Sequence, residues 1–180
     1  MIGGRNKMKC LVVSDSHGDR EILESILAHN KNKVDAFFHC GDSELEANDS
    51  LFNVFNGVIG NMDFDMKFPE ELVKVVDGET IYVSHGHLTG VKTNLLTLSL
   101  RAQSKNANFA FFGHTHELGC EMTDDGMLIL NPGSISLPRG KYRGLGGTYA
   151  IIEADAKFVR VTYFTRQHES VPELSSEFKR

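Results

Sequence analysis

Short apolar runs, each followed at once by a polar loop that contains glycine, recur along the first two thirds of the chain. Runs of this length are typical of buried strands. The loops that follow them carry carboxylate, imidazole or amide side chains. The pattern predicts strands at five positions: 10–13, 36–38, 58–59, 81–83 and 109–112.

Two segments between these runs have apolar residues at helical spacing. The first covers 22–27, and Asn30 offers a stop signal for it. In the second, Leu96 and Leu100 lie one turn apart, and Thr93 could cap the helix. We expect both helices to lay an apolar stripe on a sheet.

The last third of the chain has a different pattern. Residues 119–130 indicate a hairpin, and 149–153 with 158–164 indicate a second antiparallel pair. The polar tail 166–180 is expected to be loose. Strand–helix units followed by antiparallel pairs predict an α/β fold with two packed sheets and outer helices.

The whole chain, 1–180, is expected to form a single domain, because its length suits one core and no linker or repeat divides it. The polar segment 1–7 is predicted to be a flexible extension, with Met8 as an alternative start. Three cysteines without a close pair favour a reducing, cytoplasmic location. No apolar run approaches the length of a membrane span, so no membrane association is expected.

Acidic residues outnumber basic ones. The chain has 19 Lys and Arg against 24 Asp and Glu, a formal net charge of -5 at pH 7. A broad nucleic-acid surface is therefore not expected, although a local basic patch is compatible with this balance. A homo-oligomer is also compatible with the sequence.

Ligand-type residues two positions apart occur in three of the loops. Oxygen and nitrogen ligands of this kind suit Mn, Fe, Zn, Co or Ni, and the lack of thiolates disfavours a structural zinc site. Each loop alone is weak evidence, since aspartates often cap helices and single histidines are often structural. Their conjunction at strand ends favours one shared site. The pairs are Asp15 with His17, His85 with His87, and His114 with His116.

Together these motifs resemble those of the calcineurin-like metallophosphoesterases, in order and in approximate spacing, from about residue 9 to residue 164. The chain is most similar to the small, single-domain bacterial and archaeal phosphodiesterase branch. This resemblance implies an αββα sandwich of two packed mixed sheets flanked by helices. The motifs are Asp15-x-His17, Gly41-Asp42, Gly60-Asn61-x-Asp63, His85-Gly86-His87 and Gly113-His114-Thr115-His116.

The resemblance further implies two divalent transition-metal ions, with Mn favoured and Fe, Zn, Ni or Co as alternatives. One carboxylate can span two ions about 3.5–4 Å apart. Carried over residue by residue, the implied ligands are Asp15, His17 and His116 for one ion, Asn61, His85 and His114 for the other, and Asp42 as the bridge.

The expected reaction is hydrolysis of a small phosphodiester by a metal-held hydroxide. Asp42 and Asn61 would act through the metals. His87 could orient the phosphate, protonate the leaving group or hydrogen-bond a ligand. Arg139 could contact a substrate oxygen or be an ordinary surface residue. Asp63 is expected to fix a loop or a ligand.

One position departs from the phosphoprotein phosphatases of the family. They carry a proton-donating histidine after the asparagine, where this chain has Met62. Because a monoester with an alkoxide leaving group needs that proton most, a phosphodiester is favoured. A nuclease or phosphomonoesterase on the same scaffold is the alternative. A non-catalytic interaction module, as in the retromer subunit of similar fold, is a third hypothesis.

Overall fold

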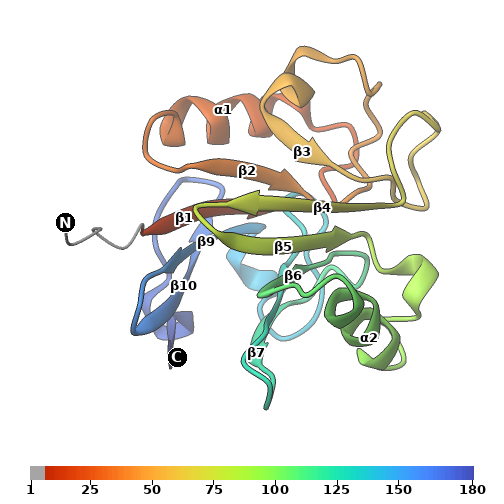
Figure 1. Cartoon of the computed structure of the whole chain (residues 1–180). Coiled ribbons are helices and arrows are strands. Elements are labelled where there is room, and N and C mark those ends of the chain that lie inside the picture. Colours follow the sequence, from red (N-terminus) through yellow and green to blue (C-terminus); the bar gives the residue numbers. More distant parts are fainter. Residues whose placement is uncertain (1–6) are drawn as a thin grey trace.

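Two β-sheets pack face to face in the computed structural model, which describes residues 7–180 (Figure 1). Helix α1 (Arg20–Asn30) covers the outer face of one sheet, and α2 (Leu96–Ser104) covers that of the other. The layers are therefore helix, sheet, sheet, helix, which confirms the expected αββα sandwich. The expected extension, 1–7, lies outside the described residues apart from Lys7.

The first sheet is built from β1 (Met8–Val13), β2 (Ala36–His39), β3 (Phe55–Gly57), β9 (Thr148–Ala154), β10 (Phe158–Thr165) and β11 (Ser176–Lys179). Its strand order is β11-β10-β9-β1-β2-β3. The first three strands of the chain run parallel, and the last three pair antiparallel. The pair β9–β10 confirms the second hairpin expected from the sequence.

The second sheet is built from β4 (Glu71–Val76), β5 (Glu79–Ser84), β6 (Phe109–Phe111), β7 (Leu118–Met122) and β8 (Leu128–Pro132). Its order is β4-β5-β6-β8-β7, with β5, β6 and β8 parallel. The antiparallel pair β7–β8 confirms the first expected hairpin. Four 3₁₀ turns complete the described elements: Ser50–Asn53, His87–Thr89, Arg143–Leu145 and Pro172–Leu174.

Strand alternation sorts the apolar side chains into three layers. Along β1, Cys10 and Val12 face the second sheet, whereas Leu11 and Val13 face α1. A third layer under α2 includes Tyr82 and its neighbours on the second sheet. The inter-sheet layer holds the two sheets in a fixed relation, so loops from both can meet at one edge.

Loops from both sheets join at that edge. The backbone N–H of Asp15, after β1, donates to the carbonyl of Gly41, after β2, at 3.0 Å. In the second sheet, Gly113 after β6 donates to His85 after β5 at 3.0 Å. These bonds hold the carboxyl ends of neighbouring parallel strands together, where ligands bind in open α/β sheets.

The strand predicted at 58–59 lies earlier in the chain. β3 ends at Gly57: Val58 still donates to His39 of β2 at 3.3 Å, but Ile59 donates to Pro69, outside the sheet. Both apolar side chains are nevertheless buried. The sequence pattern therefore detected their burial, and the prediction of a strand there was wrong.

The predicted apolar stripe on the second helix was also wrong. Leu96 and Leu100 are 64% and 56% exposed, while Leu98 and Ala102 lie buried against the sheet. The side chain that accepts from the first N–H of this helix, that of Leu96, is Asn94 at 3.0 Å, so Thr93 is not its cap. Both faces carry leucines, and spacing alone selected the wrong pair.

The tail after residue 166 is ordered rather than loose. Ser176–Lys179 forms β11, which pairs antiparallel with β10 and extends the first sheet. Phe178 and Leu174 pack against the inter-sheet core. Their isolated apolar character within a polar segment explains why composition indicated a loose tail.

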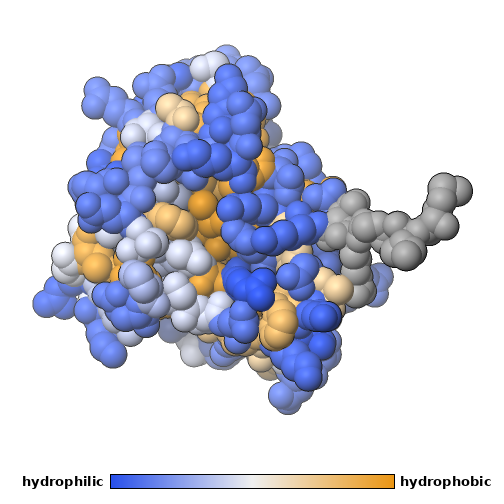
Figure 2. All heavy atoms as spheres, turned by 90° about the vertical axis from the view of Figure 1, so that its left-hand side faces the viewer, coloured by the Kyte–Doolittle hydropathy of each residue, from blue (hydrophilic) through white to orange (hydrophobic). Residues whose placement is uncertain are grey.

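Among residues 7–180, no helix is both long enough and apolar enough to cross a membrane. Hydrophilic residues cover most of the face shown in Figure 2, and the hydrophobic ones on it form smaller groups. The cysteines are free: Cys10 and Cys40 are buried, and Cys120 is half-buried.

Candidate metal centre

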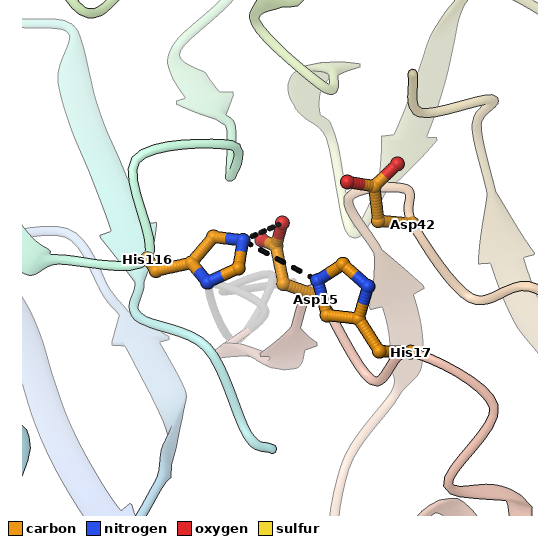
Figure 3. A group of neighbouring side chains, drawn as sticks. All are labelled: Asp15, His17, Asp42 and His116. Carbon is orange, nitrogen blue, oxygen red and sulfur yellow. Dashed lines mark hydrogen bonds and ion pairs between the residues drawn. The ribbon is translucent and has the colours of Figure 1, made fainter. Parts of the chain in front are cut away.

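Four side chains from three loops meet at the shared sheet edge (Figure 3). Asp15, His17, Asp42 and His116 each offer one ligand atom, and these atoms all lie within 4.8 Å of one another. Nε2 of His116 lies 3.1 Å from Oδ1 of Asp15 and 3.3 Å from Nε2 of His17. Two carboxylates and two imidazoles are a donor set that suits a divalent transition metal.

One buried oxygen in this cluster accepts no hydrogen bond. Oδ1 of Asp15 lacks a hydrogen-bond partner among the described residues, although the side chain is fully buried. Its other oxygen accepts from the Ser14 hydroxyl and from the backbone N–H of His114. A buried carboxylate oxygen without a donor is costly unless a cation is nearby. The residues therefore fit a bound metal ion.

Contacts at the far side of two imidazoles fix how the rings point. Nδ1 of His85 lies 2.7 Å from the carbonyl of Cys40, and Nδ1 of His116 lies 2.7 Å from that of Leu137. Since a carbonyl only accepts, Nδ1 carries the proton in both rings. In the neutral rings Nε2 then presents its lone pair to the site. Such outer contacts are usual behind metal-ligating histidines.

A second group of ligand-type side chains adjoins the first. Nε2 of His85 lies 3.2 Å from Oδ2 of Asp42 and 3.2 Å from Oδ1 of Asn61. The ring of His114 lies 5.0 Å from that of His85, centroid to centroid. Asp42 therefore borders both groups. The structure brings together all seven side chains that the sequence motifs singled out as ligands.

The backbone of five of these residues is left-handed. Non-glycine residues rarely adopt positive φ, and such residues cluster at functional sites. Tight turns, rather than an extended backbone, therefore bring together the side chains that lie two positions apart in these loops. The φ angles are 55° for Asp15, 46° for His17, 54° for Asp42, 67° for His114 and 62° for His116.

Two glycines are required by close approach to the carboxylates. A Cβ on Gly60 would lie 2.1 Å from Oδ1 of Asp42, and one on Gly113 would lie 2.5 Å from Oδ2 of Asp15. Both distances are below any real contact. The glycine in each motif thus lets the backbone pass directly beside a metal-facing carboxylate.

Burial and neighbouring charges shift the pKa values of the titratable groups in the cluster. Burial raises the pKa of Asp15, but the contact with His116 and the charge of His85 outweigh it and hold the pKa below its usual value. The reverse holds for His85: burial lowers its pKa, yet Asp42 and Asp15 raise it overall. Burial, followed by the charges of His85 and Lys92, lowers the pKa of His114 to about 4. His114 is thus neutral near pH 7.

His87 and Arg139 lie at the border of the site. The ring of His87 lies 5.4 Å from that of His85 and 6.2 Å from that of His114, and its Nδ1 is buried without a hydrogen bond among the described residues. Arg139 is exposed, and its backbone N–H donates to the carbonyl of His116. His87 therefore lies beside two of the implied ligands, and the Arg139 backbone is tied to a third.

Asp63 fixes a loop, one of the two roles expected for it. Its Oδ2 accepts from the backbone N–H groups of Asp42 at 2.9 Å and Gly60 at 2.7 Å, and its Oδ1 accepts from Glu44 at 2.7 Å. Asp63 therefore ties the loops after β2 and β3 to each other.

His39, left out of the predicted site, is buried and contacts the Ser16 hydroxyl.

Sequence reasoning missed two residues beside the site. Oε1 of Glu44 lies 2.6 Å from Nδ1 of His17. Lys92 lines a cleft next to Thr115 together with Arg139. Glu44 follows Asp42 by two positions, and its acidic type in that loop was the available signal. Nothing near Lys92 in the sequence pointed to the site.

Comparison with known proteins identifies the family to which this chain belongs. The family model for the calcineurin-like phosphoesterase superfamily domain matches residues 8–157. The chain therefore belongs to the calcineurin-like phosphoesterase superfamily.

Among curated proteins, it is 37% identical over 169 residues to the probable metallophosphoesterase YsnB of Bacillus subtilis, covering 94% of this chain and 98% of that one. It is 28% identical to the phosphodiesterase MJ0936 of Methanocaldococcus jannaschii over 145 residues, covering 70% and 83%.

Solved structures show the same fold. A predicted phosphoesterase of Streptococcus pneumoniae TIGR4 matches with a TM-score of 0.94 and 41% identity, covering 98% of this chain and 100% of that one. Vacuolar protein sorting 29 of Cryptosporidium parvum matches with a TM-score of 0.73 and 18% identity, covering 97% and 99%. The second likeness extends to the fold alone.

Proposed function

We propose that this protein is a phosphodiesterase that uses two divalent transition-metal ions, most simply Mn, to hydrolyse a small phosphodiester. The observation that carries the proposal is the convergence of Asp15, His17, Asp42 and His116 within 4.8 Å, with one buried carboxylate oxygen lacking a donor. Metal-binding residues on a phosphoesterase fold favour hydrolysis of a phosphate ester.

The residues divide into two ligand groups that share Asp42. Asp15, His17 and His116 would hold one ion, and Asn61, His85 and His114 the other. Bound metals would supply water activation near neutral pH and would neutralise charge on the phosphate oxygens. The neutral amide of Asn61 keeps the total negative charge of the ligands low.

The remaining groups would act on the substrate itself. Arg139 and Lys92 bring two positive charges to the cleft beside the centre, where they can bind phosphate oxygens. His87 has a free, buried Nδ1, and burial followed by the charge of His85 lowers its pKa. A neutral His87 accepts a hydrogen bond more readily than it donates a proton, which favours a role in orientation.

A diester is the preferred substrate because the chain lacks a general acid next to Asn61. Met62 occupies that place and cannot donate a proton. The printed name of the archaeal relative, a phosphodiesterase, supports the same choice.

The alternatives have less support. A nuclease would need a wide basic surface, and the net charge of -5 opposes one. A phosphomonoesterase would lack its usual acid at Met62. The fold is shared with vacuolar protein sorting 29, which keeps an interaction module as the third candidate. The complete set of ligand-type side chains favours catalysis.

A metal-resolved hydrolysis screen tests the proposal. Metal-free protein is reconstituted with Mn, Fe, Zn, Co or Ni and assayed on bis(p-nitrophenyl) phosphate, p-nitrophenyl phosphate and duplex DNA. We expect metal-dependent turnover, fastest on the diester, that Asp15→Asn abolishes and that the exposed control Asp124→Asn retains. Absence of turnover with every metal would refute the proposal.

A further inference from the structure

A cleft of about 430 Å³ opens beside the metal centre. Thr115 lines it and lies between His114 and His116 in the chain, so the cleft borders these two ligands. Two cations, Lys92 and Arg139, also line it, against one carboxylate, that of Glu117. This end of the surface therefore favours an anion, as the proposed phosphate substrate requires.

A second, smaller hollow of about 240 Å³ shares Glu117 with this cleft. It lies over β7 and β8, with Leu95 from the segment before α2 at its border. Its apolar lining comes from Phe112 and Ile129, which are 6% and 2% exposed. The cleft and the hollow thus meet at Glu117, and the two together are called the groove.

Two glutamates supply the charged groups of the hollow. Glu117, just before β7, and Glu121, within it, line the hollow together with Gly119 and Cys120. Neither carboxylate accepts a hydrogen bond within the described part of the chain, and both glutamates are exposed. Asn131 is different, because its Oδ1 already accepts from the backbone N–H of Gly133 at 2.9 Å. The free side-chain carboxylates of the hollow are therefore those of the two glutamates.

Gly119 leaves this hollow open. It sits within β7 opposite Asn131, where a side chain would be ordinary, and a Cβ built on it meets no atom within 4 Å. Its backbone is outside the left-handed region, so conformation does not demand glycine. A glycine inside a strand often marks a place where a ligand approaches closely.

We propose that the groove binds the nucleoside part of a nucleotide diester, with the phosphate beside Lys92 and Arg139 and the base over Phe112 and Ile129. The apolar floor suits a flat ring, and the unpaired carboxylates of Glu117 and Glu121 suit its N–H donors. A second anionic group or a plain alkyl chain would leave those carboxylates repelled or unpaired. This inference rests on the proposed diesterase activity and specifies its substrate class.

The test compares two diesters that share one leaving group: adenosine 5′-(p-nitrophenyl phosphate) and methyl p-nitrophenyl phosphate. Gly119→Leu fills the hollow without straining the backbone. Val75→Leu is the matched control, because Val75 is 63% exposed on β4, at the opposite edge of the same sheet. All proteins are loaded with Mn before the assay.

We expect Gly119→Leu to lower kcat/KM for the adenosine ester by about tenfold or more, a loss of roughly 1.4 kcal/mol or more in transition-state binding. The methyl ester should be hydrolysed as by the unsubstituted protein, and Val75→Leu should change neither rate. An equal effect on both esters, or no effect on either, overturns the inference while leaving the diesterase intact.

If neither ester is hydrolysed, the proposed function fails, and binding decides the inference separately. Calorimetric titration of metal-free protein with adenosine 5′-monophosphate should then still show binding that Gly119→Leu weakens about tenfold. No binding, or equal binding by the two proteins, overturns the inference.

Discussion

Nδ1 of His17 lies 2.6 Å from Oε1 of Glu44, and this contact directs Nε2 of the same ring toward Asp15 and His116. The two residues come from different loops, after β1 and after β2. Glu44 thus acts on the centre through His17 rather than as one of the seven implied ligands.

Glu44→Gln should lower Mn affinity by about 10–100-fold, because it weakens the contact that fixes the His17 ring. Fluorescence competition with a metal indicator measures this. Glu46→Gln, in the same loop but exposed, serves as the control and should bind Mn normally. Equal Mn affinity in Glu44→Gln and the unsubstituted protein would show that His17 needs no support.

Asp42 borders both ligand groups, whereas Asn61 borders one. Asp42→Asn should therefore reduce activity at saturating Mn more than Asn61→Asp does, since it weakens both metal positions. Parallel assays on bis(p-nitrophenyl) phosphate decide this. A smaller or equal loss in Asp42→Asn would argue against a bridging role.

Met62 lies at the rim of the centre. Its backbone N–H donates to Oδ1 of Asp42 at 2.7 Å, and its side chain is 54% exposed. Met62→His should raise kcat/KM for alkyl monoesters selectively, because a positioned general acid contributes about 10²–10⁴-fold and matters most for a basic leaving group. Aryl diester hydrolysis should change little. An unchanged monoester-to-diester ratio in a metal-replete variant would show that Met62 does not set specificity.

Asp19 supports the fold at the start of α1. One oxygen caps α1 by accepting from the N–H of Ile22 at 3.1 Å, and the other pairs with Arg166 at 2.7 Å. Burial raises the pKa of Asp19, but Arg166 and the cap outweigh it and hold the pKa below its usual value. Asp19→Ala should lower the free energy of unfolding by about 1–2 kcal/mol at pH 7.

The pH dependence of that loss has a defined sign. A depressed carboxyl pKa stabilises the fold above the unfolded pKa, near 3.9, and this contribution disappears as pH falls through the lower folded value. Urea unfolding of metal-free protein should therefore show a smaller effect of Asp19→Ala near pH 3 than at pH 7. An effect that is constant or larger in acid would contradict the ion pair.

The sequence predicted the layers and the ligand-type residues because both depend on short-range patterns. Buried strands read as apolar runs, and the residues after them are adjacent in sequence to the strand ends. Convergence of the loops on one site was expected from the strand ends, and the grouping of Asp15 with His116 was implied by the family resemblance. The left-handed turns at these residues could not be predicted, since positive φ is uncommon for any non-glycine residue, even though Asp and His adopt it more often than most.

Other features depend on packing that spacing does not encode. Leu98 rather than Leu96 faces the sheet because the orientation of α2 is set by its contacts. The tail is ordered because β11 pairs with β10, a contact between segments that composition does not indicate. Lys92 lines the cleft because of the tertiary fold, so no local motif predicted its position.

Counting bound metal against activity tests most directly whether two ions activate this protein for diester hydrolysis. Metal-free protein is titrated with Mn while bis(p-nitrophenyl) phosphate hydrolysis is followed at neutral pH, and bound Mn is counted by elemental analysis at each step. We expect activity to rise with bound metal and to level off at two ions per chain. A plateau at one ion, or no activity at any Mn content, would contradict it.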